Sequence, residues 1–185
     1  RPAQLDYIGV KRFDDKGTVI GEERFIGLFG SAYYTNSALD LPLISSKVMA
    51  VCEASPFAKG THNYKTLINI LETYPRDEIL QSSVKELLHN VTGILQMQER
   101  DYCGLFVRRD AFDRFYSCMV YVPRERYNTK LRMETQKLLQ EAFDSEEDVE
   151  FTTFFSESVH ARTHYIVRVN STKVDIDVKE IEKNL

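Results

Sequence analysis

The sequence predicts an α+β fold in which antiparallel β-hairpins pack against helices. At three places, two segments rich in aromatic and β-branched residues are joined by a short turn, as in a hairpin. Between the hairpins, apolar residues recur with the helical period of 3.6. The second half has the order hairpin, helix, hairpin, which packs naturally as a helix layer on an antiparallel sheet.

The first hairpin is expected at the start of the chain. Residues 5–13 (LDYIGVKRF) read as a strand, and residues 18–30 (TVIGEERFIGLFG) as the returning strand. Between them, Gly17 supplies the positive φ that a tight turn requires. Gly21 and Gly27 interrupt the returning strand and indicate β-bulges or close backbone approach.

Helices are expected over residues 42–54, 62–73 and 83–98. Pro56 ends the first, and residues 74–77 (YPRD) interrupt the chain as an interhelical turn, because the residue before a proline disfavours the α conformation. The third helix has the strongest amphipathic pattern, with Ser82 or Ser83 as its cap. Its apolar residues are Val84, Leu87, Leu88, Val91, Ile94 and Leu95.

The second half begins with strands over residues 102–109 and 114–122, and Asn128 caps a helix over 129–143. Strands over 149–156 and 161–169 form another hairpin, and the charged tail 173–185 is weakly helical. We therefore expect a first domain over residues 1–99, a second over 100–170 and a charged tail or linker over 171–185.

Length, composition and charge restrict the class of protein. With 185 residues, 43% hydrophobic and 28% charged, the chain has the profile of a soluble globular protein. A formal charge of −4 argues against a nucleic-acid partner. The sequence contains no stretch of about 18 apolar residues, which argues against a membrane partner. The chain begins at Arg1 without a secretory leader, so we expect a piece of a longer, cytoplasmic protein.

Motifs for catalysis, metal binding and cofactor binding are weak. Cys52, Cys103 and Cys118 are widely spaced, which favours packed thiols over a zinc site. His160 and His164 straddle the start of a strand, where a spacing of four does not bring two ligands together. Phosphate-binding glycine spacings and nucleophile motifs are missing, so we expect no catalytic, metal or cofactor residue in this chain.

Arginines gather at the ends of the first hairpin of the second half. The candidates for contact with a ligand or partner are Arg108, Arg109, Arg124 and Arg126. Arginine clusters bind carboxylates with two parallel hydrogen bonds. They also serve as interface ion pairs or as a solvated rim, so both interpretations stay open at this point.

Several blocks of sequence, in register over most of residues 1–169, carry a family resemblance. They are RPAQLDYIGVKRF (1–13), RFIGLF (24–29), LETYPRDEI (71–79), LFVRRD (105–110), FYSCMVYVPRERYNTKLR (115–132) and FFSES-x-x-AR-x-HYIVR (154–168). Through them the chain resembles the region that precedes the catalytic part of the large bacterial NAD-specific glutamate dehydrogenases.

The resemblance implies a cytoplasmic homo-oligomer, a tetramer or hexamer, whose full-length chain converts L-glutamate to 2-oxoglutarate and ammonium while reducing NAD. It implies a regulatory or assembly role here, with a PAS-like first half and an ACT-like second half. The hairpin-helix-hairpin order departs from the usual ACT order of strand-helix-strand-strand-helix-strand. No position matches the family's catalytic residues. The alternative is a separate ACT-like sensor of amino or keto acids, in which the four arginines receive a carboxylate.

Overall fold

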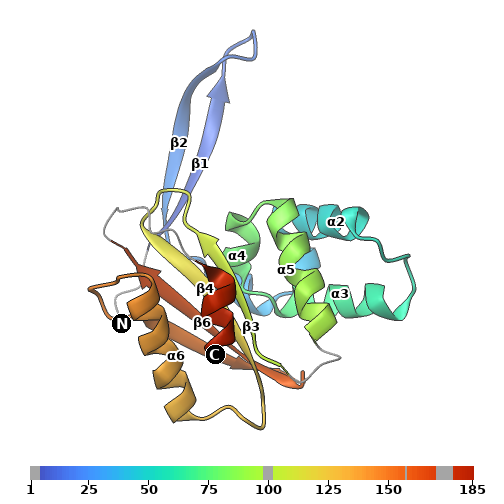
Figure 1. Cartoon of the computed structure of the whole chain (residues 1–185). Coiled ribbons are helices and arrows are strands. Elements are labelled where there is room, and N and C mark those ends of the chain that lie inside the picture. Colours follow the sequence, from blue (N-terminus) through green and yellow to red (C-terminus); the bar gives the residue numbers. More distant parts are fainter. Residues whose placement is uncertain (1–4, 98–101, 157, 170–176) are drawn as a thin grey trace.

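The structure is a computed structural model that describes residues 5–97, 102–156, 158–169 and 177–185 (Figure 1). A two-stranded hairpin, β1 (Asp6–Phe13) and β2 (Val19–Gly27), opens the chain and projects away from the rest of the molecule. A helical unit follows. It consists of α1 (Ser31–Thr35), the 3-10 helix η1 (Ala38–Asp40), α2 (Ile44–Ala54), α3 (His62–Thr73), α4 (Arg76–Gln81) and α5 (Val84–Met97).

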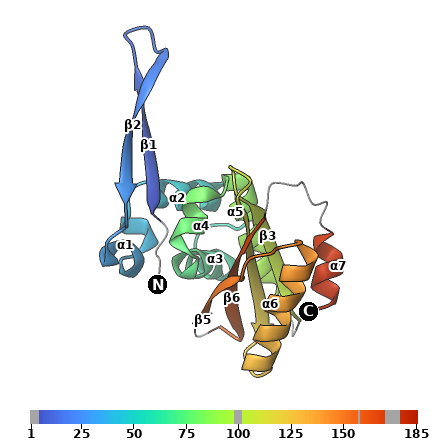
Figure 2. The ribbon, with the colours of Figure 1, turned by 90° about the vertical axis from the view of Figure 1, so that its left-hand side faces the viewer.

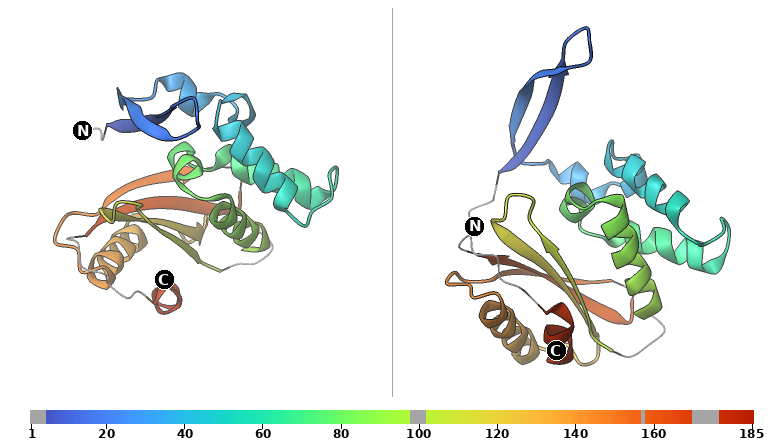
Figure 3. Two further views of the ribbon diagram at one scale, coloured as in Figure 1. Left: turned by 90° about the horizontal axis from the view of Figure 1, so that it is seen from above. Right: turned by 45° about the horizontal axis from the view of Figure 1, so that its top comes forward.

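The second half forms a four-stranded antiparallel sheet with the strand order β3-β4-β6-β5. Its elements are β3 (Gly104–Arg109), β4 (Phe115–Pro123), α6 (Thr129–Ala142), β5 (Glu150–Phe155), β6 (His160–Arg168) and α7 (Val178–Lys183). Helices α6 and α7 lie on one face of this sheet, and the helical unit lies on the other (Figures 2 and 3). The predicted hairpin-helix-hairpin order is confirmed, with α7 added at its end.

Strand β4 joins two hydrophobic cores because its successive side chains point to opposite faces of the sheet. Met119 and Tyr121 pack with the helical unit. Cys118 and Val120 belong to the core beneath α6 and α7, together with Leu139. Eight of the nine residues of β4 are buried, so this strand has protein on both sides.

Local sequence signals explain where several helices begin. Ser83 and Glu86 form a capping box at α5, in which the backbone N–H of Glu86 donates to Ser83 Oγ and the N–H of Ser83 donates to the Glu86 carboxylate, at 3.2 and 2.8 Å. Asn128 caps α6 by accepting from the Leu131 N–H. At Gly93, an added Cβ would lie 2.8 Å from the Phe106 ring, so glycine lets α5 approach β3 closely.

Most predicted elements are confirmed, and the helix over 62–73 agrees with α3 at both ends. The turn expected at 74–77 is wrong in part, because Pro75 is the N-cap of a further short helix, α4. The bulge in the first hairpin lies beside Gly21, where Arg12 pairs with Gly21 and Phe13 with Val19. Gly27 ends β2.

The structure bears on the expected domains. A PAS-like first half is not confirmed, because residues 31–97 fold into helices and β1 and β2 are the strands described in that half. The expected tail at 171–185 contains α7, whose Ile181 is 6% exposed and packs into the core of the sheet. The expected domain boundary near residue 100 lies outside the described residues.

Among the helices in the described ranges, none has the length and apolarity needed to cross a membrane.

Candidate functional site

The four candidate arginines lie in two separate places. Arg108 and Arg109 end β3, beside the turn that leads into β4. Arg124 and Arg126 follow the opposite end of β4. Because β4 is a nine-residue strand, its length separates the two pairs, and the structure does not bring the four side chains together at one site.

Arg108 is held in a buried ion pair that connects the sheet to the helical unit. Its Nε and Nη2 donate to the two carboxylate oxygens of Glu78 in α4, at 2.8 and 2.7 Å. Nη2 also donates to Gln81 Oε1 at 2.9 Å. Glu78 is 2% exposed and Arg108 is 7% exposed. This two-pronged contact is the strong form of the arginine–carboxylate bond and fixes α4 against β3.

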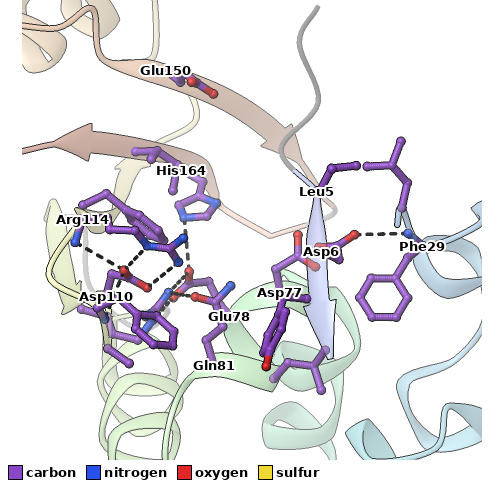
Figure 4. Close-up of a pocket in the computed structure, with 18 of the residues that line it drawn as sticks. Leu5, Asp6, Phe29, Asp77, Glu78, Gln81, Asp110, Arg114, Glu150 and His164 are labelled. Atoms are coloured by element: carbon purple, nitrogen blue, oxygen red, sulfur yellow. Dashed lines mark hydrogen bonds and ion pairs between the residues drawn. The ribbon is translucent and has the colours of Figure 1, made fainter. Parts of the chain in front are cut away.

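Ser117 of β4 and His164 of β6 extend this cluster. Figure 4 shows His164 beside Glu78. Ser117 Oγ lies 2.8 Å from His164 Nε2, and Glu78 Oε1 lies 3.7 Å from the same nitrogen. In a serine-histidine-acid triad, the acid orients the histidine through its other ring nitrogen. Ser117 is also only 1% exposed. The cluster therefore lacks the geometry of a hydrolytic triad.

The charges of the cluster follow from its burial and its partners. Burial alone would raise the pKa of Glu78, but the hydrogen bonds and charge of Arg108 outweigh it and hold that pKa below its usual value. Burial lowers the pKa of His164, and the nearby carboxylate of Glu78 only partly offsets this effect. At neutral pH the cluster thus contains an ionised Glu78 and a neutral His164.

The other candidate arginines stabilise strand ends. Arg109 Nε lies 2.6 Å from Asp113 Oδ1 in the β3–β4 turn, where both side chains are partly exposed. Arg124 Nη1 donates to the backbone oxygen of Ser156 at 3.1 Å, and its guanidinium lies 5.8 Å from the ring centre of Phe155. The backbone N–H of Arg126 donates to the oxygen of Pro123 at 2.9 Å.

An open groove lies beside the buried cluster, between the base of the first hairpin, α4 and the uncovered part of the sheet (Figure 4). Its volume is about 1520 Å³, which exceeds the roughly 300–1,000 Å³ of ordinary small-molecule sites. Its ionisable lining comes from Asp6, Asp77, Glu78, Arg108, Asp110, Arg114, Glu147, Glu150, His164 and Arg168. The groove is therefore wide and carries charges of both signs.

Among the carboxyl groups that line the groove, that of Asp77 has a strongly raised pKa. Burial, together with the neighbouring charges of Asp6 and Glu78, raises its pKa from 3.8 to about 6. The carboxylate is thus less favourable in the folded protein than in the unfolded chain. Asp77 therefore opposes folding at pH values high enough to ionise its carboxyl group.

We expect Asp77→Asn to stabilise the protein in a pH-dependent way. Because the pKa is higher in the folded state, the contribution of Asp77 to stability falls as the pH rises from about 4 through about 6. The difference in free energy of unfolding between variant and wild type should grow across that interval and level off above it. Urea unfolding at a series of pH values measures it, and a difference that is flat with pH would contradict the assignment.

The residues considered for metal or thiol chemistry lie apart from this groove or are packed. His160 Nε2 lies 3.2 Å from the backbone oxygen of Tyr102, while His164 belongs to the buried cluster. Cys52 and Cys118 are buried and Cys103 is half-buried. Burial raises the pKa of Cys52 and of Cys118, which disfavours their reactive thiolates. Within the described ranges, no three His, Cys, Asp or Glu side chains are grouped so as to hold a metal ion.

Sequence reasoning did not identify Glu78, Ser117 or His164 as members of the cluster that contains Arg108. Glu78 directly follows the segment interpreted as a turn and precedes Arg108 by 30 residues. The available signal was the position of Glu78 in the first turn after Pro75, where a short helix can begin. Nothing in the spacing of these residues shows that α4 packs against β3.

Comparisons with known proteins match both halves. Residues 41–100 match the family model described as "Glutamate dehydrogenase, helical motif 1", and residues 104–185 match "Glutamate dehydrogenase, ACT2 domain". The ACT2 match agrees with the ACT-like expectation for the second half. No solved structure matches the chain.

Full-length relatives named NAD-specific glutamate dehydrogenase are also similar. The protein of Halomonas elongata is 44% identical over all of this chain and 12% of its own length. That of Pseudomonas aeruginosa is 42% identical over all of this chain and 11% of its own length. That of Mycobacterium tuberculosis is 34% identical over 88% of this chain and 10% of its own length. The chain thus spans about an eighth or less of these relatives.

Proposed function

This chain belongs to the family of NAD-specific glutamate dehydrogenases, as part of their N-terminal region, and we propose that it serves there as a non-catalytic segment for assembly and regulation. The full-length protein would oxidise L-glutamate to 2-oxoglutarate and ammonium, with transfer of a hydride to NAD. It would act in the cytoplasm as a homo-oligomer, a tetramer or hexamer. NAD would bind outside the present residues.

The buried pair of Glu78 and Arg108 is the observation that supports this role most directly. It connects the helical motif to the ACT2 domain through two short hydrogen bonds. Separating the two parts would leave both charges without their partner, which is costly. The pair therefore holds the helices against the sheet, as a segment that transmits contacts between domains requires.

Co-purification tests the assembly role. A tagged form of the 185-residue chain, produced in the same cells as the untagged full-length enzyme, is expected to retain that enzyme on an affinity column. The Glu78→Ala variant, in which the helices and the sheet lose this ion pair, is expected to retain less. If the tagged wild-type chain retains no full-length enzyme, the assembly role is contradicted.

The groove supports a second candidate function, a sensor of amino or keto acids. Arg114 and Arg168 line it, and both are partly exposed. Arg108 is already bound to Glu78, and Arg109 lies beside Asp113. Arg114 is itself paired with Asp110 and Arg168 with Glu150, each at 2.8 Å, but both arginines are more exposed than Arg108. A sensor at this position would thus use Arg114 and Arg168, and the carboxylate of the ligand would displace or share their present partners. Calorimetric titration with a panel of amino and keto acids tests it, and the lack of heat across the panel would exclude it.

A further inference from the structure

The first hairpin is poorly supported by the rest of the chain. Within β1 and β2 no residue is buried, and only Asp6 and Ile8 are even half-buried. At its base, the backbone N–H of Phe29 donates to Asp6 Oδ2 at 3.2 Å. Figures 1 and 2 show both strands extending well beyond the helices and the sheet. A lone two-stranded hairpin is marginally stable in water, so this one needs a further contact.

Large apolar side chains cover both faces of the hairpin. Val10 and Phe25 are 50% and 57% exposed on one face, and Tyr7 and Ile26 are 50% and 67% exposed on the other. Phe13, Val19 and Ile20 are also more than half exposed near the tip. So many large apolar side chains exposed on one small element favour an interaction surface.

The sequence of β1 is complementary to itself. If two copies of β1 lie antiparallel with Gly9 opposite Gly9, then Ile8 of each copy faces Val10 of the other. On the same face, Asp6 lies opposite Arg12, an attractive ion pair repeated by the twofold symmetry. Tyr7 lies opposite Lys11 on the other face. The same arrangement of β2 about Glu23 would place two glutamates opposite each other on the axis.

We propose that this hairpin is a dimerisation arm, in which the outer edge of β1 pairs with β1 of a second copy of this chain. The result is a four-stranded sheet, β2-β1-β1-β2, that buries the apolar residues between copies. This inference rests on the proposed assembly role and names the surface that carries it. Gly9 lies at the twofold axis, where it is directly opposite Gly9 of the second copy.

Cross-linking through Gly9→Cys tests the register. Directly opposed residues of antiparallel strands have Cα atoms about 4.5–5.5 Å apart, within the range that a disulfide spans. The added Cβ would lie 2.9 Å from Glu22 Oε2 and 3.1 Å from the hydroxyl oxygen of Tyr7, so these two exposed, hydrogen-bonded side chains must move aside to admit it. We expect a covalent dimer under mild oxidation, judged against the wild type with its native cysteines. Gly21→Cys on β2, where the site is open, is the matched control and should not cross-link.

Sedimentation velocity provides a second test without added cysteines. The wild-type chain should dimerise as its concentration rises, and Arg12→Glu should remain a monomer because the new carboxylate opposes that of Asp6 in the second copy. Lys16→Glu makes the same charge change in the turn and should dimerise like the wild type.

Three results would contradict the proposed dimerisation through β1: a monomeric wild type, a dimeric Arg12→Glu variant, or a Gly9→Cys variant that does not cross-link. If the Gly9→Cys variant fails to cross-link while the chain still retains full-length enzyme on the affinity column, the assembly role stands and the arm alone is wrong. If the chain retains no full-length enzyme, the assembly role fails as well.

Discussion

Glu78→Ala is expected to lower the free energy of unfolding by about 3–5 kcal/mol, because it leaves a buried charge without its partner. Arg108 is 7% exposed, so its guanidinium cannot regain full hydration when Glu78 is removed. Urea unfolding measures the change. Glu134→Ala is the matched control, since Glu134 and Lys130 are exposed and 3.8 Å apart. Such a pair contributes about 0–1 kcal/mol.

A double variant separates the effect of charge from that of packing. Glu78→Leu combined with Arg108→Met replaces both charges by apolar groups of similar volume, and such replacements are often close to neutral. The double variant should therefore be clearly more stable than Glu78→Ala. A loss below about 1 kcal/mol for Glu78→Ala would show that the pair does not hold α4 against β3.

Met119→Asp is expected to destabilise the protein by several kcal/mol, on the order of 3–5, through burial of an uncompensated carboxylate. Met119 is 2% exposed and packs with the helical unit. Thermal unfolding measures the effect. Met133→Asp on α6 makes the same exchange at a side chain that is 57% exposed, and should change stability by no more than about 0.5 kcal/mol. A melting temperature equal to that of the wild type would mean that β4 is wrongly placed.

Local patterns are sufficient to predict most of the fold. The helix over 62–73 is predicted correctly at both ends because its signals are local: the apolar period lies within the segment and Pro75 follows shortly after it. In the structure Thr61 adds a cap at its start. The hairpin-helix-hairpin order is predictable for the same reason: turn residues and the Asn128 cap act on their immediate neighbours.

The contacts between these elements cannot be predicted in the same way. The short helix α4 exists because it packs between α2 and the sheet, and its six residues carry almost no periodic signal. The sequence indicates that the arginines can form ion pairs. Which of them is buried depends on the packing of α4 against β3, a pairing across 30 residues. The register of β4 with its neighbours then places Ser117 and His164 beside that pair.

The PAS-like expectation for the first half shows a related limit. It comes from the family resemblance, while the strand pattern of residues 5–30 predicts a hairpin, which those residues do form. The following residues, up to 97, pack as helices and add no strand to it in the described structure. A local hairpin signal does not reveal how many strands will join it.

We propose that this chain contributes structure and coupling to a glutamate dehydrogenase and performs none of its chemistry. The most direct measurement is NADH formation by the purified 185-residue chain in the presence of L-glutamate and NAD, with the full-length enzyme as positive control. We expect the absorbance of NADH to remain at the level of the buffer for the isolated chain and to rise for the full-length enzyme. Steady NADH formation that scales with the concentration of the isolated chain would contradict the claim.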